Sequence, residues 1–199
     1  MRGRRVLLAL VLGGCLAYEA RPSTGAADAA PDLAAQACEG RSDYPVGPYG
    51  KAEGAVLEDL TLKSGDGAPF RLSSLHQDCG RRLLLVSTSA GWCTACIEEQ
   101  PKLQALHEQY AAAGLVVMVA FFEDANFEPA KLRNVQDWKE RYGLDFPVLL
   151  DEAFVFGDYY DRESTPMTML VELETMTILR IMNGFDESTV RSLITQKLE

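Results

Sequence analysis

Histidine and long apolar stretches are both scarce in this sequence. Only two of its 199 residues are histidines, and no apolar run reaches the roughly 18 residues that a membrane-spanning helix needs. Positive charge is scarce as well, because 19 lysines and arginines face 29 aspartates and glutamates, which leaves a net charge of −10. A chain this acidic is not expected to bind nucleic acid, or a membrane surface through a basic patch.

A second pair of closely spaced cysteines is also missing. A structural zinc site takes four ligands, most often cysteines and histidines. His76 follows a predicted hairpin and His107 occupies a polar position of a predicted helix, so we interpret both as surface residues and predict no metal site. The five cysteines fall into three separate settings and do not form one framework: Cys15, Cys38, Cys79, Cys93 and Cys96.

The N-terminal residues have the pattern of a secretory signal. Residues 1–5 are basic, residues 6–12 are apolar and Gly13-Gly14-Cys15 follows, which predicts a signal peptide over residues 1–14. The ending Leu-Gly-Gly-Cys resembles the lipobox of bacterial lipoproteins. That resemblance implies lipidation of Cys15 and a protein held in the cell envelope, facing the periplasm, by its lipid anchor only. The alternative is an ordinary signal peptide that happens to contain Cys15.

The rest of the chain divides into a tether and one folded domain. Residues 15–50 are rich in small residues and proline, cannot bury much surface, and are expected to form a tether and loop. Residues 51–199 combine a hairpin, a β-α-β unit and a β-β-α end, which predicts an α/β fold with a mixed central sheet and helices on both faces. The expected elements are strands 56–62, 69–72 and 83–87, helix 94–113, strand 115–122, helix 129–142, strands 146–150, 167–173 and 177–182, and helix 186–198.

The most informative motif is Trp92-Cys93-Thr94-Ala95-Cys96, at a predicted junction from strand to helix. The positive end of a helix stabilises an anion, and the thiolate is the reactive form of cysteine. Cys93 at the helix start is therefore the expected nucleophile. Cys96 lies one turn further in and is expected to resolve the mixed disulfide that Cys93 forms with a substrate.

This segment and its continuation resemble a known family. Residues 92–103 are similar to the active-site segment of extracytoplasmic thioredoxin-like proteins of the TlpA type, and Glu99, Pro101 and Leu103 meet the offsets of that pattern. The resemblance extends from about Gly54 to the C-terminus. It implies a thioredoxin fold and thiol–disulfide oxidoreductase activity without a cofactor. It also implies protein thiols or disulfides as substrates and a membrane electron donor as partner.

The resemblance also assigns roles outside the dithiol. Thr165-Pro166 stands at the family's cis-proline, which binds the substrate backbone. Trp92 is separately expected to shield the site and to belong to the substrate-binding residues with Thr165 and Pro166. A functional glutamate of the family is best matched by Glu123 at the end of a predicted strand, so Glu123 is the expected catalytic base with a raised pKa. Thioredoxins proper carry a buried acid where this chain has Ser87. Glu98 and Glu99 are interpreted as solvated charges.

Two other protein classes remain open. A peroxiredoxin shares this fold, but it places a threonine three residues before its reactive cysteine, where this chain has Ala90. A copper-delivery protein of thioredoxin fold uses three residues between its cysteines and a distant histidine. We interpret the four methionines that could suggest copper binding as core residues: Met167, Met169, Met176 and Met182.

The direction of the reaction and the pairing of the remaining cysteines are predicted from fewer residues. Thr94 and Ala95, between the active-site cysteines, carry no charge, which favours a reductant over an oxidant. Cys38 and Cys79 are expected to form a structural disulfide, because spare thiols tend to pair in an oxidising compartment. Either could instead be free, or the pair could relay electrons to Cys93–Cys96.

Overall fold

A computed structural model describes residue 41 and residues 43–199 of the chain. The predicted signal peptide, Cys15, Cys38 and most of the predicted tether lie outside these residues. No helix in the described part of the chain is long and apolar enough to cross a bilayer.

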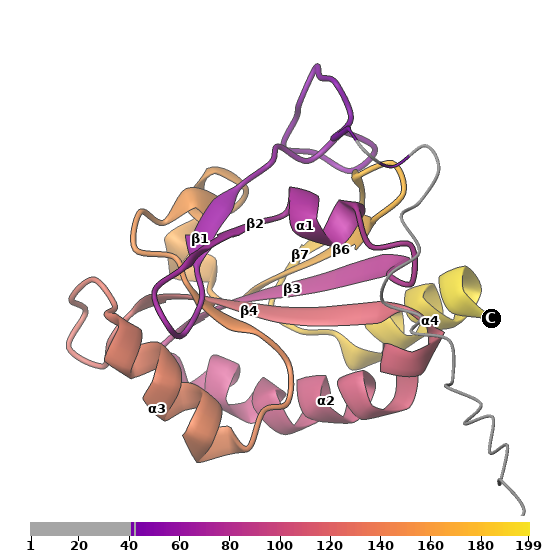
Figure 1. Ribbon diagram of the computed structural model, residues 1–199. Coiled ribbons are helices and arrows are strands. Elements are labelled where there is room, and N and C mark those ends of the chain that lie inside the picture. Colours follow the sequence, from indigo (N-terminus) through magenta and orange to yellow (C-terminus); the bar gives the residue numbers. More distant parts are fainter. Residues whose placement is uncertain (1–40, 42) are drawn as a thin grey trace, which may run out of the picture. The chain divides into compact units, whose positions relative to one another are not determined.

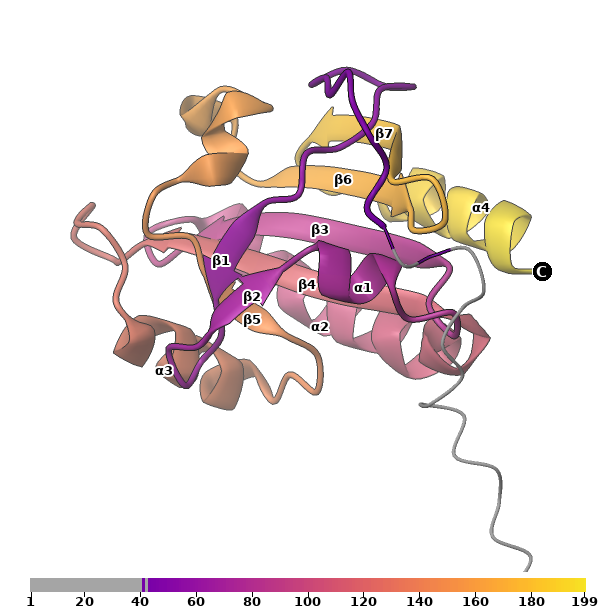
Figure 2. The same cartoon turned by 45° about the horizontal axis from the view of Figure 1, so that its top comes forward.

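The centre of the fold is a mixed sheet with the order β2-β1-β5-β4-β3-β6-β7. The three strands β3, β4 and β5 run parallel, and the remaining strands add antiparallel at either side. The predicted N-terminal hairpin is present and joins the sheet at β5 (Figure 2). The strands are β1 (Thr61–Lys63), β2 (Pro69–Arg71), β3 (Leu83–Ala90), β4 (Leu115–Glu123), β5 (Val148–Leu150), β6 (Met167–Glu172) and β7 (Thr177–Asn183).

The apolar composition of β3 and β4 is explained by their central position. Every residue of both strands is buried, as expected for parallel strands covered on both faces. Alternate residues serve the two faces: Leu83 and Leu85 belong to one core cluster, and Leu84 and Val86 to the other.

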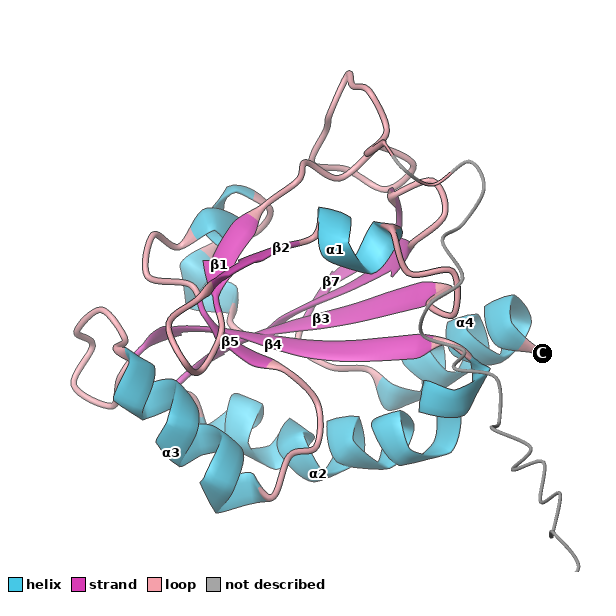
Figure 3. Cartoon of the chain, in the orientation of Figure 1, coloured by secondary structure: helices cyan, strands magenta, loops and turns pink. Residues whose placement is uncertain are grey.

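The three long helices lie on one face of the sheet (Figures 1 and 3). The crossovers β3-α2-β4 and β4-α3-β5 step in the same direction along the sheet, so right-handed connections place α2 and α3 on the same side. The α4 helix packs into the same core through Val190 and Ile194. The helices are α1 (Ser73–His76), α2 (Thr94–Tyr110), α3 (Leu132–Tyr142) and α4 (Glu187–Leu198), with short 3-10 helices η1 (Ala111–Ala113), η2 (Val155–Asp158) and η3 (Arg162–Ser164).

The opposite face has a thinner cover than the sequence predicted. Within the described residues, its cover includes α1, η2 and the irregular chain before β1, which pack there through Leu75, Phe156 and Leu57. The expected strand over residues 56–62 is shorter, because Val56 forms isolated bridges with Tyr49 and Thr177 and the ladder begins at Thr61. Asp186 caps α4, since its side chain accepts hydrogen bonds from the backbone N–H groups of Ser188 and Thr189.

The prediction of two surface histidines is wrong for His76. Its ring is buried, with Nδ1 2.8 Å from the carbonyl oxygen of Leu173 and Nε2 3.1 Å from that of Asp43. His107 is half-buried, with its ring edge against Phe146. The error arises because both positions look polar along the chain, whereas their burial depends on distant segments.

Candidate active site

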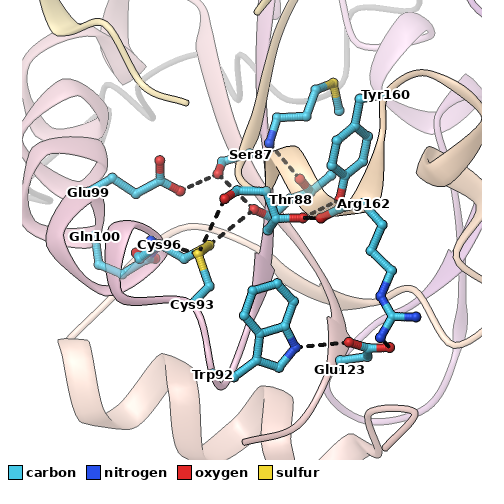
Figure 4. Close-up of a disulfide and its surroundings, with 12 residues drawn as sticks. Ser87, Thr88, Trp92, Cys93, Cys96, Glu99, Gln100, Glu123, Tyr160 and Arg162 are labelled. Carbon is cyan, nitrogen blue, oxygen red and sulfur yellow. Dashed lines mark hydrogen bonds and ion pairs between the residues drawn. A yellow bond between two sulfur atoms is a disulfide. The ribbon is translucent and has the colours of Figure 1, made fainter. Parts of the chain in front are cut away.

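Cys93 and Cys96 form a disulfide at the first turn of α2 (Figure 4). Their Cα atoms are 5.2 Å apart. Cys93 is the N-cap of the helix, with an extended backbone conformation, and its Sγ accepts a hydrogen bond of 3.1 Å from the backbone N–H of Cys96. The helix terminus therefore directs a hydrogen-bond donor at the sulfur that would carry negative charge in the reduced form.

The two sulfurs occupy different surroundings. Cys93 is 4% exposed to solvent, and Cys96 is not exposed at all. The Sγ of Cys93 lies 3.8 Å from the carbonyl oxygen of Thr165, and that of Cys96 lies 3.8 Å from the carbonyl oxygen of Thr88. This is the order of access expected for an attacking outer sulfur and a resolving inner one. The assignment of those roles remains a prediction.

The loop before β6 lies against the disulfide. The Thr165–Pro166 bond is cis, as the family resemblance implied. Thr88 fixes this loop to the sheet, because its Oγ1 accepts a hydrogen bond of 2.8 Å from the backbone N–H of Met167. The hydroxyl of Tyr160 lies 3.2 Å from Oγ1 of Thr165 and supports the loop from the other side. A substrate chain bound along Thr165 would therefore pass beside Cys93.

Glu99 is a buried acid, so its interpretation as a solvated charge is wrong. Only 2% of this residue is exposed. Ser87 on β3 donates a hydrogen bond to Oε1 of Glu99 (Figure 4), and Oε2 has no hydrogen-bond partner among the described residues. Burial raises the pKa of Glu99 to about 8, although the hydrogen bond from Ser87 acts to lower it. A carboxyl group with this pKa exchanges its proton near neutrality.

The signal that could have revealed Glu99 is its helical spacing. Glu99 follows Cys96 by three positions, which places both on one side of α2, and Cys96, Glu99, Gln100 and Leu103 are all buried. Ser87 stands where thioredoxins proper carry an acid, and here it is the donor to Glu99. The carboxyl group is therefore supplied by the helix and the hydroxyl by the strand.

Glu123 lies at the end of β4 and is held by two donors. The indole N–H of Trp92 donates to its Oε2 at 2.9 Å, and the guanidinium of Arg162 forms an ion pair with its Oε1. Glu123 is 8% exposed, whereas the side chain of Arg162 is half-exposed. These contacts join the loop before α2, the end of β4 and η3 into one network (Figure 4). The predicted role of Glu123 as a base remains a prediction, and Arg162 had no predicted role.

The geometry also bears on the two alternative protein classes. Ala90 offers no hydroxyl near Cys93, and Oγ1 of Thr88 is engaged by the backbone of Met167, so the threonine of a peroxiredoxin site has no counterpart. Met167, Met169 and Met176 are fully buried in an apolar cluster. Within the described residues, no group of three or more histidine, cysteine, aspartate or glutamate side chains could hold a metal ion.

The chain is similar to proteins of known families. A sequence model described as the AhpC/TSA family matches residues 54–180. The thioredoxin-like protein YneN of Bacillus subtilis is 32% identical over 129 residues, which cover 65% of this chain and 71% of YneN. The thiol-disulfide oxidoreductase ResA of the same organism is 24% identical over 139 residues, covering 70% and 72% of the two chains.

The fold is also found among solved structures. The exposed lipoprotein thioredoxin Etrx1 of Streptococcus pneumoniae superposes with a TM-score of 0.55 at 20% identity, covering 70% of this chain and 99% of Etrx1. This likeness confirms the thioredoxin-like fold.

Proposed function

The chain belongs to the AhpC/TSA family and is a thiol–disulfide oxidoreductase, and from this premise we propose that it reduces protein disulfides outside the cytoplasm. The observation that carries the proposal is the Cys93–Cys96 disulfide at the N-terminus of α2, with a buried acid of raised pKa one turn further along the helix.

The reaction begins with the reduced form of the protein. The Cys93 thiolate attacks one sulfur of a substrate disulfide, so that the substrate S–S bond breaks and a mixed disulfide forms. The substrate's first sulfur leaves as a thiolate and takes a proton from water. Cys96 then attacks Sγ of Cys93, the mixed disulfide breaks, and the second substrate thiol is released. Two electrons have passed from the protein to the substrate, and a membrane electron donor returns Cys93–Cys96 to the dithiol.

The second step requires Cys96 to lose its proton inside the protein. Cys96 has no exposed surface, so bulk water cannot accept that proton directly. Glu99 is the buried carboxyl group on the same side of α2, and its pKa of about 8 allows it to be partly ionised at neutral pH. We assign Glu99 the role of accepting this proton, a role that the sequence had given to Glu123.

The reducing direction is supported by the surroundings of Cys93. A strongly oxidising protein stabilises its reduced thiolate beyond what a helix terminus supplies. Here Thr94 and Ala95 are exposed and uncharged. Among the described residues, the hydrogen bond that Sγ of Cys93 accepts comes from the backbone N–H of Cys96. The inferred potential is therefore close to that of thioredoxin.

The test is the equilibrium potential of Cys93–Cys96 against glutathione. The expected value is near the roughly −270 mV of thioredoxin, and a value near the roughly −120 mV of DsbA would contradict the reducing direction. A parallel assay follows the reduction of insulin disulfides by the protein with a chemical donor. Absence of turnover by the wild-type protein, with Cys93→Ser as the blank, would contradict the activity on proteins.

The location is proposed from the N-terminal pattern. Residues 6–12 and the Leu-Gly-Gly-Cys ending support export, cleavage before Cys15 and attachment of a lipid to that cysteine. Labelling with a radioactive fatty acid should mark the wild-type protein and not Cys15→Ser. Release of the unmodified wild-type protein into the soluble fraction would contradict a lipid anchor.

A further inference from the structure

Phe127 is an exposed aromatic residue beside the active site. It keeps 61% of its surface in contact with solvent, although its ring stacks on that of Trp92 with centroids 5.3 Å apart and an angle of 18° between the planes. Its backbone has a φ of +64°, a region that a bulky side chain rarely adopts and that costs free energy. A residue that is both exposed and strained contributes little to the stability of the fold.

The loop that carries Phe127 is held by hydrogen bonds and close backbone packing. Oδ1 of Asp124 accepts hydrogen bonds from the backbone N–H groups of Asn126 and Glu128, at 2.7 and 3.1 Å. The backbone N–H of Asp124 also donates to the carbonyl oxygen of Glu128 at 2.9 Å. The loop packs so closely on Gly91 that a Cβ there would lie 2.6 Å from the backbone nitrogen of Ala125. These contacts hold the backbone of the loop against the active-site motif.

The stacked rings border a surface hollow of about 270 Å³, lined by Trp92, Phe127, Arg162 and Glu163. Arg162 and Glu163 belong to η3, which directly precedes Thr165. The hollow thus lies between the active-site loop and the loop that touches the Cys93 sulfur. Because Arg162 is paired with Glu123, the cation beside the rings is already neutralised.

We propose that the Trp92–Phe127 pair and this hollow bind an apolar side chain of the protein substrate, next to its reacting cystine. This inference rests on the proposed function and deepens it. A substrate that reacts at Cys93 must pass between the two loops, so its own chain is the occupant. Covering an exposed aromatic face removes apolar surface from water and favours binding. Substrates whose cystine is flanked by apolar residues are therefore preferred over those with polar flanks.

The test uses two synthetic peptide disulfides of the same length. In one peptide leucine flanks the cysteine on both sides, and in the other serine does. The measured quantity is the ratio of kcat/KM for the leucine peptide to that for the serine peptide. Phe127→Asn removes the ring but keeps a residue that tolerates positive φ, and Phe127→Tyr keeps the ring. Val46→Asn serves as a matched control, because Val46 is an apolar residue that is 90% exposed.

Phe127→Asn should lower the ratio about tenfold, a loss in line with part of the free energy of burying one apolar side chain. Phe127→Tyr and Val46→Asn should keep the wild-type ratio. A structural role for Phe127 would instead lower both rates together, with an unchanged ratio and a lower unfolding temperature, and this result would overturn the proposal. A wild-type ratio of one would overturn it as well. Failure of the wild-type protein to reduce either peptide would count against the proposed function itself.

Discussion

Two buried carboxyl groups near the disulfide have opposite surroundings. Glu99 has one hydroxyl donor and a second oxygen without a partner among the described residues, and burial holds its pKa far above the ordinary value. Glu123 instead receives an indole N–H and a guanidinium. The raised pKa of Glu99 is the reason for assigning proton exchange near neutrality to Glu99.

Replacement of Glu99 tests its role in proton transfer. Ionised Glu99 is the form that accepts the Cys96 proton, so the rate of resolution should rise with pH up to about 8 in the wild-type protein. Glu99→Gln should lose this rise and slow resolution on the order of 100-fold. Stopped-flow measurement of mixed-disulfide decay gives the profile, with Glu123→Gln as the companion variant. A profile that shifts in Glu123→Gln but not in Glu99→Gln would return the role to Glu123.

The same residue predicts how stability depends on pH. The pKa of Glu99 is about 8 when folded and about 4.3 when unfolded. Between these values the unfolded state releases a proton that the folded state keeps, so this contribution to stability is complete below pH 4.3 and is lost as pH rises through 8. Glu99→Gln should remove this slope, which is worth on the order of a few kcal/mol. Urea unfolding at pH 5 and pH 8.5 measures it, and an equal slope in both proteins would contradict a buried neutral carboxyl.

The order of the two sulfurs can be tested by trapping. Cys93 is the more accessible cysteine and caps the helix, so Cys96→Ser should accumulate a mixed disulfide with a peptide substrate through Cys93. Cys93→Ser, the matched variant, should accumulate little. Mass spectrometry of the trapped species identifies the sulfur, and a bond through Cys96 in the Cys93→Ser variant alone would reverse the assignment.

At the level of elements, the sequence predicts best what depends on neighbouring residues. The unbroken apolar runs of β3 and β4, the glycine stop after α3 and the Asp186 cap of α4 are all readable along the chain. The short η2 and η3 are not, because segments of four and three residues are too short to show a helical spacing of apolar residues.

In the site, too, the sequence predicts what a local motif or a family pattern contains. Cys93, Cys96 and the cis bond before Pro166 follow from a local motif or a family resemblance. The burial of Glu99 requires pairing α2 with Ser87 of β3, and the left-handed backbone of Phe127 requires the Asp124 turn. No local pattern contains that pairing, and phenylalanine is among the residues least expected at positive φ.

The close approach of the Phe127 loop to the active-site motif gives a prediction at this scale. Gly91→Ala introduces a Cβ into the 2.6 Å contact with the Ala125 nitrogen, which should push the loop away and lower the free energy of unfolding by about 1–3 kcal/mol. Gly65→Ala is the matched control, because a Cβ there meets nothing within 4 Å. Chemical denaturation measures the free energy of unfolding of both variants. Equal values would mean that the loop moves away from residue 91 without a loss of stability.

For the molecule as a whole, the Cys38–Cys79 disulfide remains a prediction. Cys38 lies outside the described residues, so this prediction rests on the sequence. It would close a loop of about 40 residues and stabilise the fold by roughly 4 kcal/mol in the chain-entropy model. Thiol counting before and after mild reduction should find that this bond survives conditions that open Cys93–Cys96. Two free thiols in the oxidised protein would refute the bond.

The position of Thr88 has a consequence for how this enzyme can diversify. Its carbonyl oxygen faces the Cys96 sulfur, and its hydroxyl holds the backbone N–H that follows Pro166. One residue of a central strand thus sets the spacing between the reacting sulfurs and the segment that would align a substrate. Phe127 takes no part in these two contacts, so a change of its side chain leaves that spacing in place. If Phe127 binds substrate as proposed, substrate preference could then change at this position while the geometry of the reacting sulfurs stays the same.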